Sequence, residues 1–426
     1  MTSRNELRQT LRPRRIAVLG AGPIGIEAAL WARALGHQVT VYERGSVGEH
    51  LRRWGFVELF SPWALNTSAL GRGILRRRGI ELPPPESRST GREFVELYLE
   101  PLAADLGDRV RGSCEVAGVA RSGLMKSEAI AASGANDRVG RPFRLLLRVT
   151  GGGAVREDEA LADIVIDATG VYGTAGALGD GGIPARGERE ARAWIDYRLP
   201  DVLGADRTRF AGRTTLVVGA GHSAATTLAG LARLVEQAPG TRVVWARRDT
   251  TAAPATVLPD DPLPARAHLA RFLNALASAP PQGIAARAGV VVSRLDVRDE
   301  CVRVSLREVA SGAESAVDVD RIVAMVGYRP NPAIHRELQV HHCYASEGPM
   351  ALAAALLGAS TDSDCLARSG FGPRSLETTE PGFFIVGHKS YGRRSDFLLR
   401  IGREQIRDVF RLLEDVPSLD LDALYA

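Results

Sequence analysis

IAVLGAGPIG, residues 16–25, decides the fold of this chain, and LVVGAGHSAA, residues 216–225, repeats its pattern. Each stretch has a short apolar run, typical of a buried strand, then G-x-G-x-x-G or G-x-G-x-x-A, then apolar residues at helical spacing. A second strand follows each helix, as HQVTVYE (37–43) and as TRVVWARR (241–248). Each stretch is therefore predicted to open a β-α-β unit that carries a phosphate-binding turn.

The composition is that of a folded protein with two or three domains. The chain has 426 residues, of which 45% are hydrophobic and 24% charged, and the net charge is only +4. Basic runs such as residues 76–78 are isolated, so they indicate solvated surface and no nucleic-acid partner is expected. We find no apolar stretch long enough to span a membrane and no clean apolar core of an export signal, which predicts a cytoplasmic protein without a membrane partner.

The cysteines and histidines do not predict a local redox or metal site. None of the four cysteines is spaced as C-x-x-C or C-x-x-x-x-C, so a local redox dithiol and a disulfide framework are not expected. In VHHCYASE (340–347), His341 and His342 would point to opposite faces of a strand, and no metal site is predicted. The cysteines are Cys114, Cys301, Cys343 and Cys365.

The first glycine-rich turn fits a dinucleotide. Gly20 allows the tight turn, Gly22 lets the backbone approach a pyrophosphate, and Gly25 lets the helix pack on its strand. The pyrophosphate would lie at the helix N-terminus, where unpaired N–H groups favour an anion. Glu43 ends the next strand, where its carboxylate can accept hydrogen bonds from a ribose. The residues predicted to bind this dinucleotide are Gly20, Gly22, Pro23, Ile24, Gly25, Glu43 and Arg44.

The second glycine-rich stretch differs from the first in its third glycine and in the residues that end the following strand. Ala224 takes the place of the third glycine, which is a tolerated form of the pattern. The following strand ends in Arg247 and Arg248, and two guanidinium groups suit the 2′-phosphate of NADPH, although a solvated strand end is the alternative. His222 could contact the cofactor or simply start the helix. The residues predicted to bind NADPH are Gly219, Gly221, His222, Ser223, Ala224, Arg247 and Arg248.

The chain resembles the two-dinucleotide-binding-domain flavoproteins, a group with thioredoxin-reductase-like enzymes, flavin-containing monooxygenases and N-hydroxylating monooxygenases. The resemblance implies an α/β fold in which a discontinuous FAD-binding Rossmann-like domain (1–208 and 323–426) carries an inserted NADPH-binding Rossmann-like domain (209–322). The first turn would then hold FAD and the second the hydride donor. The stretches that carry the resemblance are GAGPIG with Glu43, DATG (167–170), GAGHSA with ARRD (246–249), VGYRPN (326–331) and GFFIVG (382–387).

The resemblance also implies further residues near the flavin. Thr169 and Gly170 would lie near the passage between the two domains, and Gly387 near the flavin. His388 stands where relatives often have an acid that binds the ribityl chain. Asp396 is the expected substitute: Ser395, Asp396 and the N-terminus of a final helix from about residue 395 would face the isoalloxazine.

A loop after the last strand holds the candidate substrate residues. Tyr391, Arg393 and Arg394 follow that strand, where a substrate would meet the flavin. A forked guanidinium suits a carboxylate, so Arg394, with Tyr391 beside it, is predicted to bind the carboxylate of an amino-acid-like substrate.

The resemblance implies an FAD-dependent oxidoreductase reduced by NADPH, and three functions remain open. The first is a monooxygenase that uses oxygen and a flavin hydroperoxide to hydroxylate an amine or a sulfur-containing small molecule, because this needs no cysteine pair. The second is an NADPH-dependent reductase of a small disulfide, of the bacillithiol disulfide reductase type. The third is a flavoprotein redox sensor, which the second turn disfavours. Residues 171–218 contain no histidine and so lack the F-x-G-x-x-x-H element of flavin-containing and Baeyer–Villiger monooxygenases. A homodimer is compatible with the resemblance.

Overall fold

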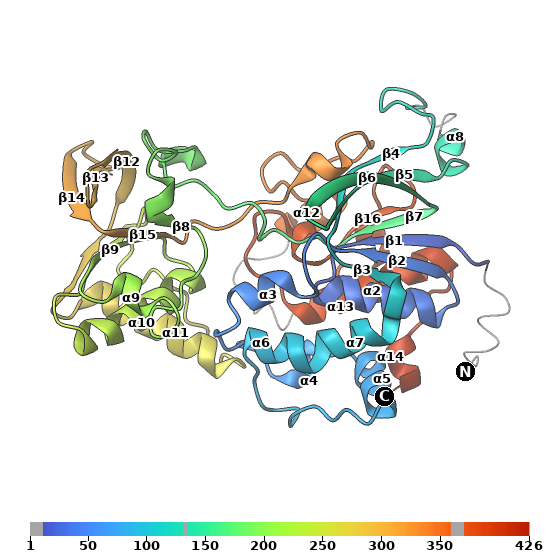
Figure 1. Ribbon diagram of the computed structural model, residues 1–426, viewed down its shortest axis with the longest axis horizontal. Helices are drawn as coiled ribbons and strands as arrows, with labels where there is room; N and C mark the ends of the chain where they lie inside the picture. Colours follow the sequence, from blue (N-terminus) through green and yellow to red (C-terminus); the bar gives the residue numbers. More distant parts are fainter. Residues whose placement is uncertain (1–11, 131–134, 359–369, 426) are drawn as a thin grey trace. The chain divides into compact units, whose positions relative to one another are not determined.

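A computed structural model describes residues 12–130, 135–358 and 370–425. The chain divides into two compact units, each with its own sheets and core (Figure 1). Unit 1 comprises Met1–Thr174 and Arg329–Ala426, and unit 2 comprises Ala175–Tyr328.

A five-stranded parallel sheet lies at the centre of unit 1. Its order is β16-β7-β1-β2-β3. Leu19 lies beside Tyr42 on one side and Asp167 on the other, so the strands end level with one another at their carboxyl edge. The apolar central strands are buried on both faces, as parallel strands usually are. The strands are β1 (Arg15–Leu19), β2 (Gln38–Tyr42), β3 (Val110–Arg111), β7 (Ile164–Asp167) and β16 (Phe383–Ile385).

Helices and a β-meander cover the two faces of this sheet (Figure 1). One apolar core joins the sheet to α2 (Pro23–Ala34), α7 (Glu100–Leu106) and α13 (Leu399–Glu414). A second core joins it to an antiparallel meander. The meander strands are β4 (Cys114–Arg121), β5 (Phe143–Gly151) and β6 (Ala154–Ala162). The other helices of unit 1 are α3 (Glu49–Arg53), α4 (Trp63–Asn66), α5 (Ala69–Arg77), α6 (Gly91–Phe94), η1 (Val95–Leu99), η2 (Gly107–Arg109), α8 (Ala135–Val139), η5 (Pro332–His335), α12 (Met350–Gly358), η6 (Pro373–Leu376), η7 (Gly387–Tyr391) and α14 (Leu421–Tyr425).

Unit 2 has the same three layers. Its parallel sheet has the order β11-β10-β9-β15-β8, with α10 and α11 on one face and an antiparallel meander on the other. The sheet strands are β8 (Ile195–Asp196), β9 (Thr214–Val218), β10 (Arg242–Ala246), β11 (Ile284–Arg287) and β15 (Arg321–Ala324). The other elements are η3 (Asp180–Gly182), η4 (Arg192–Trp194), α9 (Arg207–Phe210), α10 (His222–Gln237), α11 (Pro264–Ser278), β12 (Val290–Val297), β13 (Val302–Glu308) and β14 (Glu314–Val319).

The internal repeat extends well beyond the β-α-β unit seen in the sequence. In both units the first strand pairs with the second and with the strand that follows the meander, so β1, β2 and β7 correspond to β9, β10 and β15. The edge strand beside the third of these strands comes from a different part of the chain in each unit. In unit 1 it is β16, near the end of the chain, whereas in unit 2 it is β8, which precedes β9.

Unit 2 is longer at both ends than the inserted domain expected at residues 209–322. It begins at Ala175 because β8 pairs with β15 and so adds the preceding segment to the second sheet. It ends at Tyr328, whose hydroxyl donates a hydrogen bond to the carbonyl oxygen of Tyr197.

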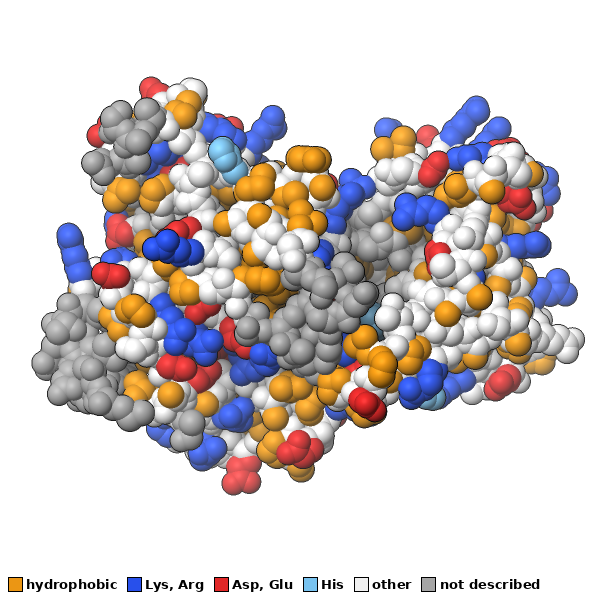
Figure 2. Space-filling model, turned by 180° about the vertical axis from the view of Figure 1, so that it is seen from behind, with side chains coloured by type: hydrophobic (Ala, Val, Ile, Leu, Met, Phe, Trp, Pro, Cys, Tyr) orange, Lys and Arg blue, Asp and Glu red, His pale blue; other side chains and the backbone are white. Residues whose placement is uncertain are grey.

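The surface carries charge of both signs. On the face shown in Figure 2, Lys and Arg side chains are interspersed with Asp and Glu side chains. None of the helices in the described part of the chain is long and apolar enough to cross a membrane.

Candidate dinucleotide-binding sites

The first turn has the backbone geometry that its glycines predict. Gly20 has a φ of +95°, which favours glycine, and a Cβ there would lie 3.0 Å from the carbonyl oxygen of Ala168. A Cβ on Gly25 would lie only 1.9 Å from the carbonyl oxygen of Gly20, so this glycine lets α2 pack on the turn. Nothing lies within 4 Å of a Cβ on Gly22, which leaves the turn open on the side where a pyrophosphate would bind.

The N-terminus of α2 can bind an anion. Gly22 is its N-cap and provides no side-chain acceptor, and Pro23 follows at the first helical position. The helix has 12 residues, and the N–H groups of its first turn have no acceptor within the helix. Phosphate oxygens of a dinucleotide would satisfy these groups, so the turn fits FAD.

Glu43 holds the turn itself. One of its carboxylate oxygens accepts a hydrogen bond from the backbone N–H of Ala21 at 2.8 Å, and the other accepts one from Gly45, also at 2.8 Å. A carboxylate has about four acceptor sites, so both oxygens can still accept ribose hydroxyl groups. Arg44, predicted to bind the same dinucleotide, is exposed, and its guanidinium lies 4.0 Å from the Glu115 carboxylate.

The structure brings the separate predicted segments of unit 1 together at one edge of the sheet. A Cβ on Gly20 would lie 3.2 Å from the Cα atom of Thr169, and a Cβ on Gly387 would lie 3.4 Å from a side-chain carbon of Ile24. Gly170 and Gly387 have φ values of +67° and +68°. The carboxyl ends of β1, β7 and β16 therefore meet here, as expected for a ligand site in a parallel sheet.

A buried ion pair lies at this edge, and sequence reasoning missed it. The Lys389 ammonium lies 2.6 Å from Oδ2 of Asp167 and donates to the Thr169 hydroxyl at 3.2 Å, and that hydroxyl donates to Oδ1 of Asp167 at 2.6 Å. Burial alone raises the pKa of Asp167, but Lys389 and His335 hold it below its usual range. The signal in the sequence was Asp167 itself, an acid that ends the apolar strand and is the first residue of DATG.

The loop after β16 differs from the prediction. The final helix α13 begins at Leu399, not near Ser395, so Ser395 and Asp396 are not in its first turn. Asp396 forms a two-pronged ion pair with Arg394, with contacts of 2.6 and 3.0 Å. This pair lies within the loop that precedes the helix. The contribution of Ser395 and Asp396 to flavin binding stays a prediction.

The two candidate substrate residues both make contacts within the protein. The fork of Arg394 is already taken by Asp396, and its third nitrogen donates to the Leu356 carbonyl oxygen. Tyr391 is only 3% exposed and packs edge-on against Phe397. The contact of Tyr391 and Arg394 with a substrate carboxylate stays a prediction.

His388 occupies the place of the expected acid and packs between aromatic rings. It stacks on Phe397, with ring centroids 5.6 Å apart, and meets Tyr172 edge-on at 5.7 Å. A ring nitrogen of His388 lies 3.0 Å from the Arg394 carbonyl oxygen. Burial lowers the pKa of His388. A histidine ring has no negative charge in its neutral or its protonated form, so His388 does not supply the charge of the expected acid.

The second turn repeats the first in unit 2. Gly219 has a φ of +123°, and a Cβ there would lie 2.2 Å from the Met325 carbonyl oxygen. Nothing lies within 4 Å of a Cβ on Gly221, the N-cap of α10, which has 16 residues and no side-chain cap. His222 and Ser223 are exposed at the helix start, and Ala224 is buried. The turn therefore fits a second dinucleotide in the way the first fits FAD.

The two arginines that follow β10 lie in different environments. Arg247 is 5% exposed and donates to the carbonyl oxygen of Asp249 at 2.7 Å, so its guanidinium is held by the protein. Arg248 is exposed. The predicted 2′-phosphate contact thus depends on Arg248, and the role of Arg247 in it stays a prediction.

The cysteines offer no paired thiols in the described residues. Cys114, Cys301 and Cys343 are free, and Cys365 lies outside the described residues. Cys114 is 1% exposed, and burial raises the pKa of its thiol.

Comparisons with known proteins agree with this architecture. Residues 1–49 match a family model described as pyridine nucleotide-disulphide oxidoreductase. A bacillithiol disulfide reductase from Bacillus cereus is 15% identical, with a TM-score of 0.66 and coverage of 95% of this chain and 99% of that chain. A cadaverine monooxygenase of desferrioxamine biosynthesis from Erwinia amylovora, bound to FAD, is 12% identical, with a TM-score of 0.62 and 96% coverage of each chain. No curated protein matches the sequence.

A third solved structure is an ornithine N-hydroxylase from Kutzneria sp. 744, described with reduced FAD, NADP⁺ and L-ornithine. It is 15% identical, with a TM-score of 0.59 and coverage of 95% of this chain and 99% of that chain. The chain has the fold of the two-dinucleotide-binding-domain flavoproteins. The predicted fold class is confirmed, and FAD and a nicotinamide dinucleotide are the cofactors of this fold. Reductases and monooxygenases both occur among its oxidoreductases.

Proposed function

We propose that this protein is an FAD-dependent oxidoreductase that NADPH reduces and oxygen reoxidises, as a monooxygenase that hydroxylates an amine or a sulfur-containing small molecule. The observation that carries the proposal is the pair of open turns. Gly22 and Gly221 each start a helix with free space beside them, and each lies in its own unit of the same chain. Two dinucleotides in one chain suit a flavin and its hydride donor.

The choice of oxygen as the electron acceptor rests on the thiols. Transfer to a disulfide substrate through a dithiol needs two neighbouring cysteines, and the three cysteines of the described residues are free and far apart in sequence. Reaction with oxygen needs no protein thiol. Two solved structures of the same fold are named as hydroxylating enzymes of amines, which supports the class of substrate.

A specific observation favours the alternative, reduction of a small disulfide through a single thiol. The Ser346 hydroxyl, with the backbone N–H groups of Ser346 and Ala345, lowers the pKa of the Cys343 thiol. A lowered pKa raises the share of thiolate, the form that attacks a disulfide. The solved bacillithiol disulfide reductase has the same fold.

The test is anaerobic reduction of the flavin-loaded protein by NADPH and, separately, by NADH, followed by rapid mixing with oxygen. We expect NADPH to bleach the flavin, and oxygen then to produce a transient whose absorbance differs from those of both flavin states. Direct return to the oxidised spectrum, together with NADPH-dependent cleavage of a small disulfide that Cys343→Ser abolishes, would establish the alternative instead.

A matched pair of variants assigns each turn to its cofactor. Gly22→Asp and Gly221→Asp each place a carboxylate where a pyrophosphate would lie, and the free space and N-cap position allow the new side chain without strain. We expect Gly22→Asp to purify without FAD. Gly221→Asp should retain FAD and its reduction by dithionite but lose reduction by NADPH. If Gly221→Asp is reduced by NADPH at the normal rate, the second turn is not the NADPH site.

A further inference from the structure

A cavity in unit 1 is lined by residues that belong neither to a glycine-rich turn nor to the loop after β16. Its volume is about 360 Å³, near the lower end of the roughly 300–1,000 Å³ of small-molecule sites. The side chains of Asn331 and Arg336 are exposed, so the cavity is open to solvent. Its polar lining residues are Lys126, Asn331, His335, Arg336 and His342.

Part of the lining is apolar. Leu338 lines the cavity and belongs to the core between the first sheet and its meander, and Val340, also in the lining, packs against this core. Pro332 and Ala333 of η5 add further apolar surface. Apolar walls with a few polar groups are typical of a site for an organic molecule, and less so of a site for an inorganic ion.

The charged groups that line the cavity are cations. Lys126 and Arg336 carry a positive charge, and none of the lining residues in the described part of the chain is acidic. The two histidines bind each other, with their Nε2 atoms 2.9 Å apart, and add no negative charge. The cavity therefore attracts an anionic ligand.

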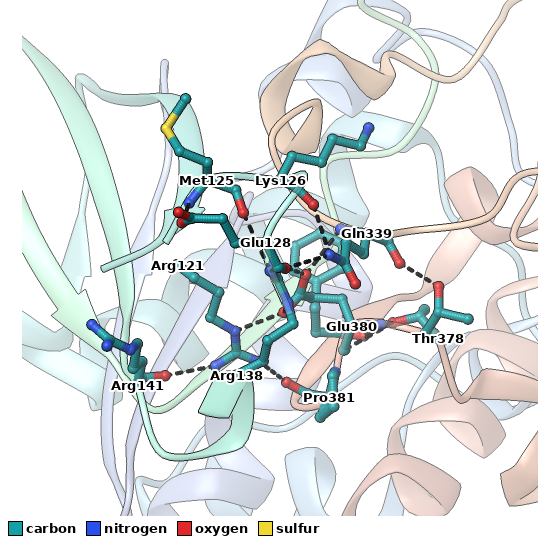
Figure 3. Close-up of polar contacts among 12 residues, drawn as sticks. Arg121, Met125, Lys126, Glu128, Arg138, Arg141, Gln339, Thr378, Glu380 and Pro381 are labelled. Carbon is teal, nitrogen blue, oxygen red and sulfur yellow. Dashed lines mark hydrogen bonds and ion pairs between the residues drawn. The ribbon is translucent and has the colours of Figure 1, made fainter. Parts of the chain in front are cut away.

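The buried acid behind the lining does not cancel this positive charge. The Glu380 carboxylate accepts a hydrogen bond from the backbone N–H of Gln339, next to Leu338, at 2.9 Å. It also accepts hydrogen bonds from Arg121 and Arg138, each at 2.7 Å, and Figure 3 shows both guanidinium groups directed toward it. Two cations around one anion leave an excess of positive charge beside the cavity.

The Lys126 ammonium is held in place by the protein itself. It donates a hydrogen bond to the Arg336 carbonyl oxygen at 2.8 Å. The Gln339 side chain donates to the carbonyl oxygen of Lys126 at 2.6 Å, a contact drawn in Figure 3. An ammonium group has three N–H donors, so two remain for a ligand. Because the Lys126 side chain is already ordered, binding a ligand costs less conformational entropy.

The Arg336 guanidinium is a second donor at the same cavity. Its side chain is exposed and forms no hydrogen bond or ion pair with the described part of the chain. A free guanidinium fork matches a carboxylate, which can accept two parallel N–H bonds. The Asn331 side-chain oxygen accepts the N–H of Ala333 at 3.0 Å, and its NH₂ group is a further donor.

We propose that this cavity binds a small organic carboxylate with an apolar body. The carboxylate accepts hydrogen bonds from Lys126 and Arg336, and the apolar body packs against Leu338 and Val340. The site is additional to the two dinucleotide sites, and it does not depend on which acceptor reoxidises the flavin.

The two lysines of the chain make the proposal directly measurable. Among 54 basic residues only Lys126 and Lys389 are lysines, and Lys389 is 1% exposed. Lys126 is therefore the one exposed lysine side chain. A reagent that acetylates amines reports on it specifically, and mass spectrometry of the digested protein measures the rate.

The first test follows acetylation of Lys126 in the flavin-loaded protein, with benzoate as the probe. For a Kd of about 1 mM, about 10 mM benzoate should slow the acetylation about tenfold, because the rate falls by the factor 1 + [L]/Kd. Benzamide has nearly the same shape without the charge and should leave the rate unchanged. No slowing by benzoate, or equal slowing by benzamide, would overturn the proposal.

A matched pair of variants tests the second cation with the same measurement. We expect Arg336→Gln to raise the benzoate concentration for half protection at least about tenfold, because it removes a charged hydrogen-bond donor. Arg374→Gln removes an exposed arginine outside the lining and should behave as the wild type. Unchanged protection in Arg336→Gln would refute the site.

Inorganic phosphate separates an organic carboxylate from an anion of any kind. It carries the charge but no apolar body, so we expect it to protect Lys126 at least about tenfold more weakly than benzoate. Protection at the same concentration would overturn the assignment to an organic carboxylate. These measurements record binding alone, so they stand even if NADPH fails to reduce the flavin.

Discussion

The two glycine-rich turns have almost the same backbone but different surroundings. Gly22 has φ −79° and ψ −177°, and Gly221 has φ −79° and ψ 179°. The strand beside the first turn ends in Glu43, which accepts a hydrogen bond from the turn. By strand pairing, Arg247 takes the corresponding place in unit 2 and bonds to Asp249 instead. The phosphate-binding geometry is thus shared, and the strand end decides which charges lie around the nucleotide.

The same comparison extends to the end of the third strand. Asp167 pairs with Leu19 in unit 1, and Ala324 pairs with Val218 at the matching position in unit 2. Both are buried, but only Asp167 is charged, and it has Lys389 as its partner. Unit 1 therefore carries at its sheet edge a buried ion pair that unit 2 replaces with a methyl group.

Removing one member of this ion pair should give the largest effect. We expect Lys389→Met to lower the free energy of unfolding by about 4 kcal/mol, because it leaves the buried Asp167 carboxylate without its cation. The double variant Asp167→Ala with Lys389→Met makes the edge resemble that of unit 2 and should recover most of the loss. Urea unfolding followed by circular dichroism measures both. If the single variant is as stable as the wild type, His335 alone compensates Asp167.

A substitution at the third glycine position of the pattern, Gly25 or Ala224, should give the next largest change in stability. A Cβ on Gly25 would lie 1.9 Å from the Gly20 carbonyl oxygen, whereas unit 2 accommodates Ala224 at the same place. We expect Gly25→Ala to cost about 3 kcal/mol of stability through overpacking and to lower the FAD content of the purified protein. Ala224→Gly is the matched control and should cost at most about 1 kcal/mol. Equal losses in the two variants would show that the turns are packed alike.

The reason for this difference lies in the carbonyl group of the first glycine. The Trp245 indole N–H donates to the Gly219 carbonyl oxygen at 2.8 Å. The corresponding residue of unit 1 is Val41, which has no donor. The bond from Trp245 coincides with a φ of +123° at Gly219 against +95° at Gly20. The carbonyl groups of the two first glycines therefore differ in their hydrogen-bond partner, which the G-x-G-x-x-A pattern alone does not show.

The helices after the two turns differ in a buried acid. Glu27 of α2 is 3% exposed and accepts hydrogen bonds from Ser68 and Trp31, whereas its counterpart in α10 is Thr226. Burial is the main cause that raises the pKa of Glu27 to about 7, from a usual value near 4.5. Because the folded-state pKa is the higher one, the unfolded chain loses this proton from about pH 4.5 while the folded protein keeps it to about pH 7, so stability falls as the pH rises through this range.

Glu27→Gln removes this titration. Relative to the wild type, we expect the variant to gain about 3 kcal/mol in free energy of unfolding between pH 5 and pH 8. The counterpart Thr226→Val should show no such pH dependence relative to the wild type. Urea unfolding at the two pH values checks both variants. A constant difference between Glu27→Gln and the wild type would mean that the Glu27 carboxyl keeps its usual pKa.

The sequence predicted what depends on local patterns. The two turns, their strands and their helices lie where the glycines and apolar spacing placed them, because these features act within a few residues. The pair of Asp167 with Lys389 joins residues that are 222 positions apart in the chain, and no local pattern encodes it. The final helix begins at Leu399 and not near Ser395, and the local pattern did not show this boundary.

The nucleotide preference should give the smallest change. Arg248 is exposed at the strand end of unit 2, while Arg247 is buried against Asp249. We expect Arg248→Gln to raise the KM for NADPH about tenfold and to leave the KM for NADH unchanged, because only NADPH has a 2′-phosphate that the guanidinium can bind. Arg44→Gln at the matching place of unit 1 is the control and should alter neither value. Steady-state reduction of an artificial electron acceptor with each nucleotide gives both KM values. If Arg248→Gln changes the KM values for NADPH and NADH equally, Arg248 does not bind the 2′-phosphate, and charge at this position does not distinguish the two turns.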